Sequence, residues 1–239
     1  MRALSNSELI GMWECGCAED SIERALTILA CCTGDSRERL AHLGIGDRDA
    51  RLLRLHTQMF GPSLDGFAEC PACHERLEYT LFTHDLAIEP PEDIPIALMA
   101  GDRSMTLRVP DSIDLAEIAE CADEVHATRL LAKRCIVDAA ELAEDELTDD
   151  LIDAIACRIA AADPRTETLI ALSCSSCRHE WEVTLDIERF LWSKICAAGK
   201  RLVREVHALA SVYGWSEAEI LAMSPVRRQS YLELICPIC

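Results

Sequence analysis

A twelve-residue pattern occurs twice in this chain, and it restricts the possible folds more than any other feature. The first copy spans residues 70–81 and the second spans residues 174–185. In each copy a Cys-x-x-Cys pair is followed, at the same offsets, by a large apolar residue, a glutamate, a β-former, a threonine and a leucine. The alternation after each pair predicts a short β-strand with one buried face.

The cysteines of this repeat are candidate metal ligands: Cys70, Cys73, Cys174 and Cys177. Two thiolates at positions i and i+3 of a tight turn can bind one ion, and two such turns complete the tetrahedral four-cysteine site that zinc accepts. We therefore predict that two segments about a hundred residues apart form the knuckles of one discontinuous zinc ribbon. Because four cysteines leave no open coordination position, the zinc would be structural.

The sequence leaves other interpretations of these cysteine motifs open. A redox dithiol is disfavoured because neither pair lies between a strand and a helix of a βαβ unit. His74 and His179 flank the pairs and are alternative ligands, although we expect them to face solvent or to hydrogen-bond near the site. A second metal site would require the termini to meet, since the other close pairs are Cys15 with Cys17 and Cys236 with Cys239.

Charge restricts the partners of this chain. Half of its 239 residues are hydrophobic, which is typical of a globular protein, and the formal net charge is −19. Such a negative field repels phosphate, so the electrostatic footprint of a nucleic-acid binder is missing. Residues 111–153 hold 14 acidic against 3 basic side chains, whereas residues 186–239 hold 6 against 7. This difference suggests a protein partner for the tail, or else a solvated acidic helix face in the middle.

Cysteine usage bears on the compartment. The chain has 14 cysteines, no signal peptide is visible in its first residues, and no run approaches the roughly 20 apolar residues of a membrane span. We expect a cytoplasmic protein, where thiols stay reduced and paired Cys-x-x-Cys motifs indicate metal. Most other cysteines sit among apolar residues at helical spacing and are expected to be small core residues: Cys31, Cys32, Cys121, Cys135, Cys157 and Cys196.

Helical periodicity dominates the rest of the sequence, and the predicted fold class is mostly α (α+β), with helical units flanking the ribbon. Caps at Asp20 or Ser21, at Asp47 and at Ser216 predict helix starts. The longest pattern covers residues 186–213, with a soft point at Gly199. A strand at residues 104–109 is expected to pair with the ribbon strands.

The helical periodicity and the two Cys-x-x-Cys pairs together predict four parts of the chain. They are an N-terminal helical unit (1–66), the zinc ribbon (67–88 and 171–186), an acidic helical middle (104–167), and a C-terminal long helix with a helical hairpin (187–239). No catalytic constellation stands out, since the 7 histidines are scattered and no phosphate-binding loop occurs. The C-terminal aromatic residues are typical of interface anchors, or of an ordinary core: Trp192, Tyr213, Trp215 and Tyr231.

Taken in order, several motifs together resemble a known family. They are Leu9-x-x-x-Trp13, GDRDARLLRL (46–55), Phe60-Gly-Pro62, the two knuckles, LRVPDS (107–112), FLW (190–192), EVHALA (205–210), YGW (213–215), ILAMSP (220–225) and RRQSYL (227–232). The chain resembles a family encoded with contractile phage tails and tail-derived injection systems, and it is more distantly similar to T4-type baseplate hub assembly proteins. The terminal Cys236-x-x-Cys239 is not a feature of that family.

The resemblance implies a non-enzymatic role as a baseplate component or as a chaperone of baseplate or hub assembly. It implies baseplate or hub proteins as partners and no catalytic residue. The charge balance and the lack of a long apolar run lead us to expect neither nucleic acid nor membrane as a partner. Cys70, Cys73, Cys174 and Cys177 are the site residues that it supports. The alternative function is a zinc-ribbon adaptor that binds nucleic acid or transcription machinery.

Overall fold

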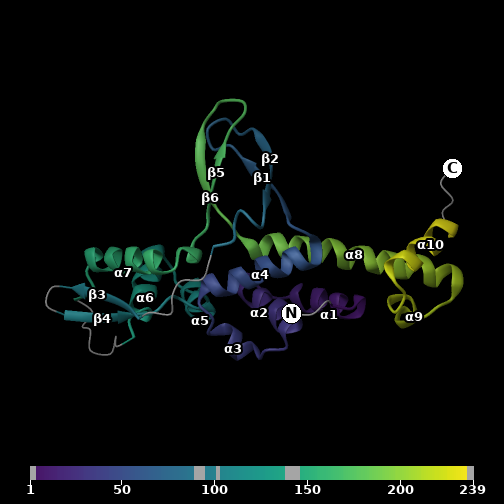
Figure 1. The fold of residues 1–239 in the computed structure, drawn as a ribbon, viewed down its shortest axis with the longest axis horizontal. Coiled ribbons are helices and arrows are strands. Elements are labelled where there is room, and N and C mark those ends of the chain that lie inside the picture. Colours follow the sequence, from purple (N-terminus) through teal and green to yellow (C-terminus); the bar gives the residue numbers. More distant parts are fainter. Residues whose placement is uncertain (1–3, 89–94, 101–102, 138–145, 236–239) are drawn as a thin grey trace. The chain divides into compact units, whose positions relative to one another are not determined.

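The computed structural model describes residues 4–88, 95–100, 103–137 and 146–235. Helices dominate, and the strands form three two-stranded hairpins (Figure 1). The mostly α fold class is therefore confirmed. The chain divides into two compact units, one of residues 1–34 and 188–239 and the other of residues 35–187. The four-part division remains a prediction.

The first unit is all helical. Its helices are α1 (Asn6–Gly16), α2 (Ser21–Thr33), α8 (Ile187–Tyr213, from its second residue), α9 (Glu217–Leu221) and α10 (Pro225–Ile235). The predicted cap at Asp20 is confirmed, because its carboxylate accepts hydrogen bonds from the backbone N–H groups of Ile22 and Glu23. Ser216 and Glu219 form the predicted capping box at the start of α9.

Helix α8 runs without interruption through Gly199, so the expected soft point is not a break. A Cβ atom at Gly199 would lie 2.8 Å from the ring of Trp13, so this glycine lets α1 and α8 approach closely. The apolar stripe of α8 supplies fully or almost fully buried side chains to the core: Leu191, Ile195, Leu202 and Leu209. Ion pairs add to this packing, as Arg24 of α2 binds Glu188 at 2.9 Å.

The second unit contains the remaining helices. They are α3 (Arg37–Ala41), α4 (Ile45–Phe60), α5 (Ser112–Ala119), α6 (Glu124–Arg134), α7 (Asp149–Ala162) and the short 3₁₀ helix η3 (Pro164–Thr166). The expected cap at Asp47 is wrong, because α4 begins at Ile45 and Gly44 is its N-cap. Gly44 bridges to Asp111, and the N–H of Ile45 donates to the carbonyl of Pro110. The N-terminus of α4 is therefore held by contacts with residues that are distant in sequence.

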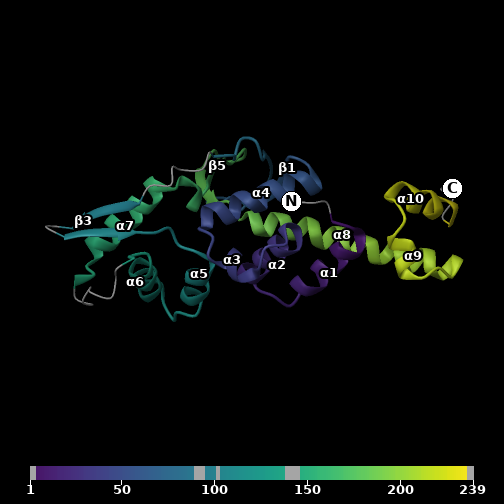
Figure 2. The same cartoon turned by 60° about the horizontal axis from the view of Figure 1, so that its bottom comes forward.

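The hairpins of the second unit are β1 (Ser63–Glu69) with β2 (Arg76–Phe82), β3 (Ile96–Ala100) with β4 (Arg103–Leu107), and β5 (Leu169–Ser173) with β6 (Glu180–Thr184). The predicted strand near residues 104–109 exists as β4, but its expected pairing with the ribbon is wrong. It pairs with β3, and this hairpin lies against α7 (Figure 2). Met105 and Leu107 of β4 share a core with Ile152 and Ile155 of α7, which explains the arrangement.

Cysteines outside the repeat occupy varied environments. Cys32 and Cys135 are buried as expected, whereas Cys157 is exposed on α7, so its assignment to the core is wrong. Cys31, Cys121 and Cys196 are half-buried. Among the helices that the structure describes, none has both the length and the apolar character to cross a membrane.

Candidate metal centre

Two hairpins of the second unit carry the repeated pattern. Each Cys-x-x-Cys lies at a hairpin turn, between β1 and β2 and between β5 and β6. The hairpins lie side by side, with both turns at the same end (Figures 1 and 2). The sequence predicted only the strand that follows each pair; the strand that precedes it was missed.

The two turns have the same backbone structure. In the first, the N–H of Cys70 donates to the carbonyl of Glu75, and the N–H of His74 donates to the carbonyl of Cys70, both at 2.9 Å. In the second, Cys174 receives the equivalent bond from Arg178 at 2.9 Å. His74 and Arg178 both adopt left-handed backbone angles, with φ of 60° and 61°. Because non-glycine residues rarely adopt this conformation, its occurrence in both turns indicates one knuckle geometry used twice.

The four thiol sulfurs meet in one cluster. The Sγ atoms of Cys70 and Cys177 are 3.6 Å apart, as are those of Cys73 and Cys174, and all four lie within 4.8 Å of one another. Zinc–sulfur bonds of about 2.3 Å in a tetrahedron place the sulfurs about 3.8 Å apart, so these distances suit one ion. They are also far longer than a disulfide bond of about 2.05 Å.

One cysteine of each knuckle is buried and the other is exposed. Cys70 and Cys174 are 0 % and 1 % exposed, whereas Cys73 and Cys177 face solvent. The inner pair would therefore anchor the cluster to the hairpins, and the outer pair would close it. We predicted that two segments about a hundred residues apart come together, and the positions of the four sulfurs confirm this.

The thiols of the cluster differ in acidity. A hydrogen bond from the backbone of Cys177 is the main cause that lowers the pKa of Cys174 to about 7. The backbone N–H of Glu75 lowers the pKa of Cys73, but the Cys177 thiol, desolvation and the other sulfurs outweigh it and raise that pKa to about 12. Four thiolates so close repel one another, so a bound cation is needed for all of them to ionise together.

The flanking histidines lie outside the sulfur cluster. His74 is within 2.9 Å of the carboxylate of Glu69, and the ring of His179 stacks on Trp181. Cys15 and Cys17 are exposed, and in the described part of the chain they belong to no cluster of potential metal ligands. Cys236 and Cys239, their predicted partners in a second site, lie outside the described residues.

Sequence reasoning missed a cavity in the second unit. It has a volume of about 470 Å³ and is lined by residues of α4, the segment after β2, the segment from η3 towards β5, and the end of β6. Its lining combines threonines with leucines and includes no histidine, cysteine or lysine, and its charged residues are Asp49, Arg54, Arg165 and Glu167. Burial raises the pKa of Asp49, partly offset by Arg48 beside it. No local motif marks this cavity, because its walls come from four separate segments.

The geometry defines a helical protein with a discontinuous four-cysteine centre, and comparison with protein families agrees with the resemblance noted above. A family model described as T4 bacteriophage base plate protein matches residues 15–192, which is 178 of the 239 residues. The chain belongs to this family, and its role lies in the structure or assembly of a phage baseplate. The match includes both knuckles and ends near the start of α8. No curated protein and no solved structure matches the chain.

Proposed function

We propose that this chain is a non-enzymatic structural component or assembly factor of the baseplate of a contractile tail-like particle. It acts through protein–protein contacts with baseplate or hub proteins in the cytoplasm, where such a particle is assembled. The match to the baseplate family over residues 15–192 carries this proposal.

In this proposal the four cysteines bind one structural zinc ion. The support is the sulfur cluster, in which Cys70, Cys73, Cys174 and Cys177 lie within 4.8 Å of one another. A closed shell of four thiolates stabilises the fold and leaves no position for activated water. The zinc would join two small hairpins. Each hairpin is a sheet of only two strands and has too little core to be stable by itself.

The partner surface in this proposal is the C-terminal region from Phe190 to Leu234. Three of its aromatic residues gather in one cluster, in which the ring of Trp215 lies 4.5 Å from that of Tyr213 and 4.8 Å from that of Tyr231. The guanidinium of the exposed Arg227 lies over Tyr231. Tyrosine, tryptophan and arginine are the side chains that most often anchor protein interfaces.

Charge at the ribbon argues against the alternative of nucleic-acid binding. Arg76 and Arg178 are exposed there, but they are outnumbered by exposed glutamates: Glu69, Glu75, Glu78, Glu180 and Glu182. A surface that neutralises phosphate needs an excess of cations, and this one has an excess of carboxylates.

A paired binding experiment tests the proposal. The tagged chain is co-expressed with baseplate and hub proteins of a contractile tail-like particle, captured, and assayed in parallel for DNA binding over a range of salt concentrations. We expect stable capture of at least one baseplate protein, weakened by Trp215→Ala but not by Arg54→Ala, a control at an exposed position of α4. Tight DNA binding that falls steeply with salt, together with no captured baseplate protein, would refute the proposal.

A further inference from the structure

The two units share the charge of the chain very unequally. Residues 1–34 and 188–239 hold 10 acidic and 9 basic side chains, a net charge of −1. Residues 35–187 hold 32 acidic and 14 basic side chains, a net charge of −18. Almost the whole negative charge therefore belongs to the unit of residues 35–187. The other unit is nearly neutral, so local groups of basic side chains on it are not outweighed by its own net charge.

Helix α8 presents such a surface, because its acidic residues are paired inside the first unit. Glu188 binds Arg24 at 2.9 Å, and Glu205 binds Arg228 of α10 at 2.8 Å. Glu188 and Arg228 are buried, so neither pair contributes appreciable charge to the surface. The charge that α8 shows to solvent is consequently cationic.

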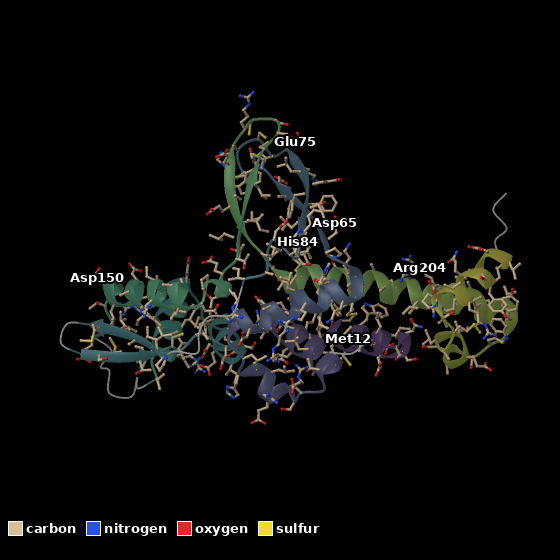
Figure 3. All side chains as sticks on the ribbon, in the orientation of Figure 1. Met12, Asp65, Glu75, His84, Asp150 and Arg204 are labelled. Atoms are coloured by element: carbon tan, nitrogen blue, oxygen red, sulfur yellow. The ribbon has the colours of Figure 1, made fainter. Side chains whose placement is uncertain are left out.

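Two exposed cations of α8 lie on one side of the helix. Lys200, Arg204, His207 and Ser211 are exposed and follow one another at intervals of three and four residues, and together with the exposed Val203 we call them the α8 basic face. The exposed Arg201 lies beside this face and is paired with Glu205. Val203 adds an exposed apolar side chain to this face. Within the described residues, neither Lys200 nor Arg204 takes part in an ion pair; Arg204 is labelled in Figure 3.

The second unit offers a complementary helical surface on α7. Asp150 and Asp153 are exposed on the first turns of this helix, and we call them the α7 acidic face; Asp150 is labelled in Figure 3. Asp149 beside them is paired with Arg129 at 3.0 Å. Asp150 and Asp153 have no ion-pair partner among the residues that the structure describes.

We propose that the α8 basic face of one copy binds the α7 acidic face of a second copy. Both faces are helical and exposed, and they carry opposite charges. The α7 acidic face of a second copy therefore supplies carboxylates that can pair with Lys200 and Arg204. Because the two faces differ, the contact is head-to-tail and can repeat from copy to copy, as in a ring or an open chain.

Sedimentation of the full-length protein at about 0.02 M and 0.5 M salt tests this contact, because the Debye length falls from roughly 20 Å to about 4 Å over that range. We expect masses above one chain at low salt and the mass of one chain at high salt. Lys200→Gln with Arg204→Gln should weaken the low-salt association about tenfold or more, as should Asp150→Asn with Asp153→Asn.

Mixing these two neutralised variants is the sharper test. Each retains one intact face, so the mixture should form a species of two chains and nothing larger. Arg54→Gln with Arg76→Gln makes the same net-charge change at exposed sites outside α8 and should leave association intact. Three results would overturn the proposal: a monomer at low salt, association unchanged in both variants, or salt-sensitive DNA binding lost with Lys200 and Arg204.

Discussion

Cys174 is the residue at which local geometry and metal chemistry meet most directly. It is buried, its sulfur lies 3.6 Å from that of Cys73, and backbone hydrogen bonds lower its pKa to about 7, which favours the thiolate near neutral pH. Its removal would leave three thiols from two knuckles, which is an incomplete site for zinc.

We therefore predict that Cys174→Ser lowers bound zinc from about one ion per chain to well below half, and lowers the melting temperature by about 10 °C or more. Elemental analysis and thermal unfolding check this. The control is Cys157→Ser, a change at an exposed thiol on α7 that should alter neither quantity. If the wild-type protein contains no zinc and chelators leave its melting temperature unchanged, the metal proposal fails.

Asp114 is a second residue with a defined electrostatic role, within the second unit. Its side chain is 0 % exposed and accepts hydrogen bonds from Arg108 at 2.6 and 2.8 Å and from Arg134 at 2.6 Å. Its carboxylate also accepts from the backbone N–H of Asp111 at 2.9 Å. Burial raises the pKa of this carboxyl, but the two arginines and the backbone N–H outweigh it and lower the pKa to about 2.

We predict that Asp114→Asn destabilises the protein by about 3 kcal/mol, because it leaves two arginines without their shared carboxylate. Urea unfolding measures this change. Glu120→Gln, at an exposed position at the end of α5, is the matched control and should change stability by less than about 0.5 kcal/mol. Equal effects of the two substitutions would contradict the role assigned to Asp114.

The same carboxyl predicts a pH dependence. Its folded-state pKa of about 2 lies below the ordinary value of 3.8, so its contribution to stability is complete above about pH 4. That contribution is lost as the pH falls from about 4 through 2, because the unfolded state then binds a proton that the folded state resists. Acid titration of the unfolding free energy should show a shallower fall for Asp114→Asn than for the wild-type protein.

At the scale of elements, the contact between α1 and α8 depends on Gly199. A Cβ atom there would lie 2.8 Å from the rigid indole ring of Trp13, which cannot move as the tip of a flexible side chain can. Helix propensity alone favours replacement of this glycine by almost any residue other than proline. The packing requirement therefore outweighs the local preference of the helix.

We predict that Gly199→Val costs about 2 kcal/mol through overpacking against Trp13. Ala197→Val, at an exposed position of the same helix, should cost less than about 1 kcal/mol because it changes propensity alone. Thermal or urea unfolding of the two variants distinguishes these effects. A neutral or stabilising Gly199→Val would show that α1 and α8 do not pack as described.

On the scale of the whole molecule, the zinc proposal concerns one unit. Both knuckles and their hairpins belong to residues 35–187, whereas the core of α1, α2 and most of α8 belongs to the other unit. We predict that chelation reduces amide-exchange protection mainly in β1, β2, β5 and β6, and much less at Leu202 and Leu209 of α8. Uniform loss of protection throughout the chain would contradict this assignment.

The local features of this protein follow from its sequence alone. The repeated Cys-x-x-Cys pattern predicted two equivalent knuckles, and their sulfurs do meet. The cap at Asp20, the capping box of Ser216 and Glu219, and the periodicity of α8 each predicted an element that the structure confirms. These features succeed because their causes, side-chain capping and burial of one face, act within a few residues.

Only the tertiary structure decided the features that depend on distant partners. The start of α4 at Ile45 depends on Pro110, β4 pairs with β3 over the core of α7, and Gly199 is required by Trp13. The cavity and the ion-pair network of Asp114 likewise combine segments separated along the chain. The physical reason is that packing and ion pairing depend on spatial neighbours, which a local pattern does not specify.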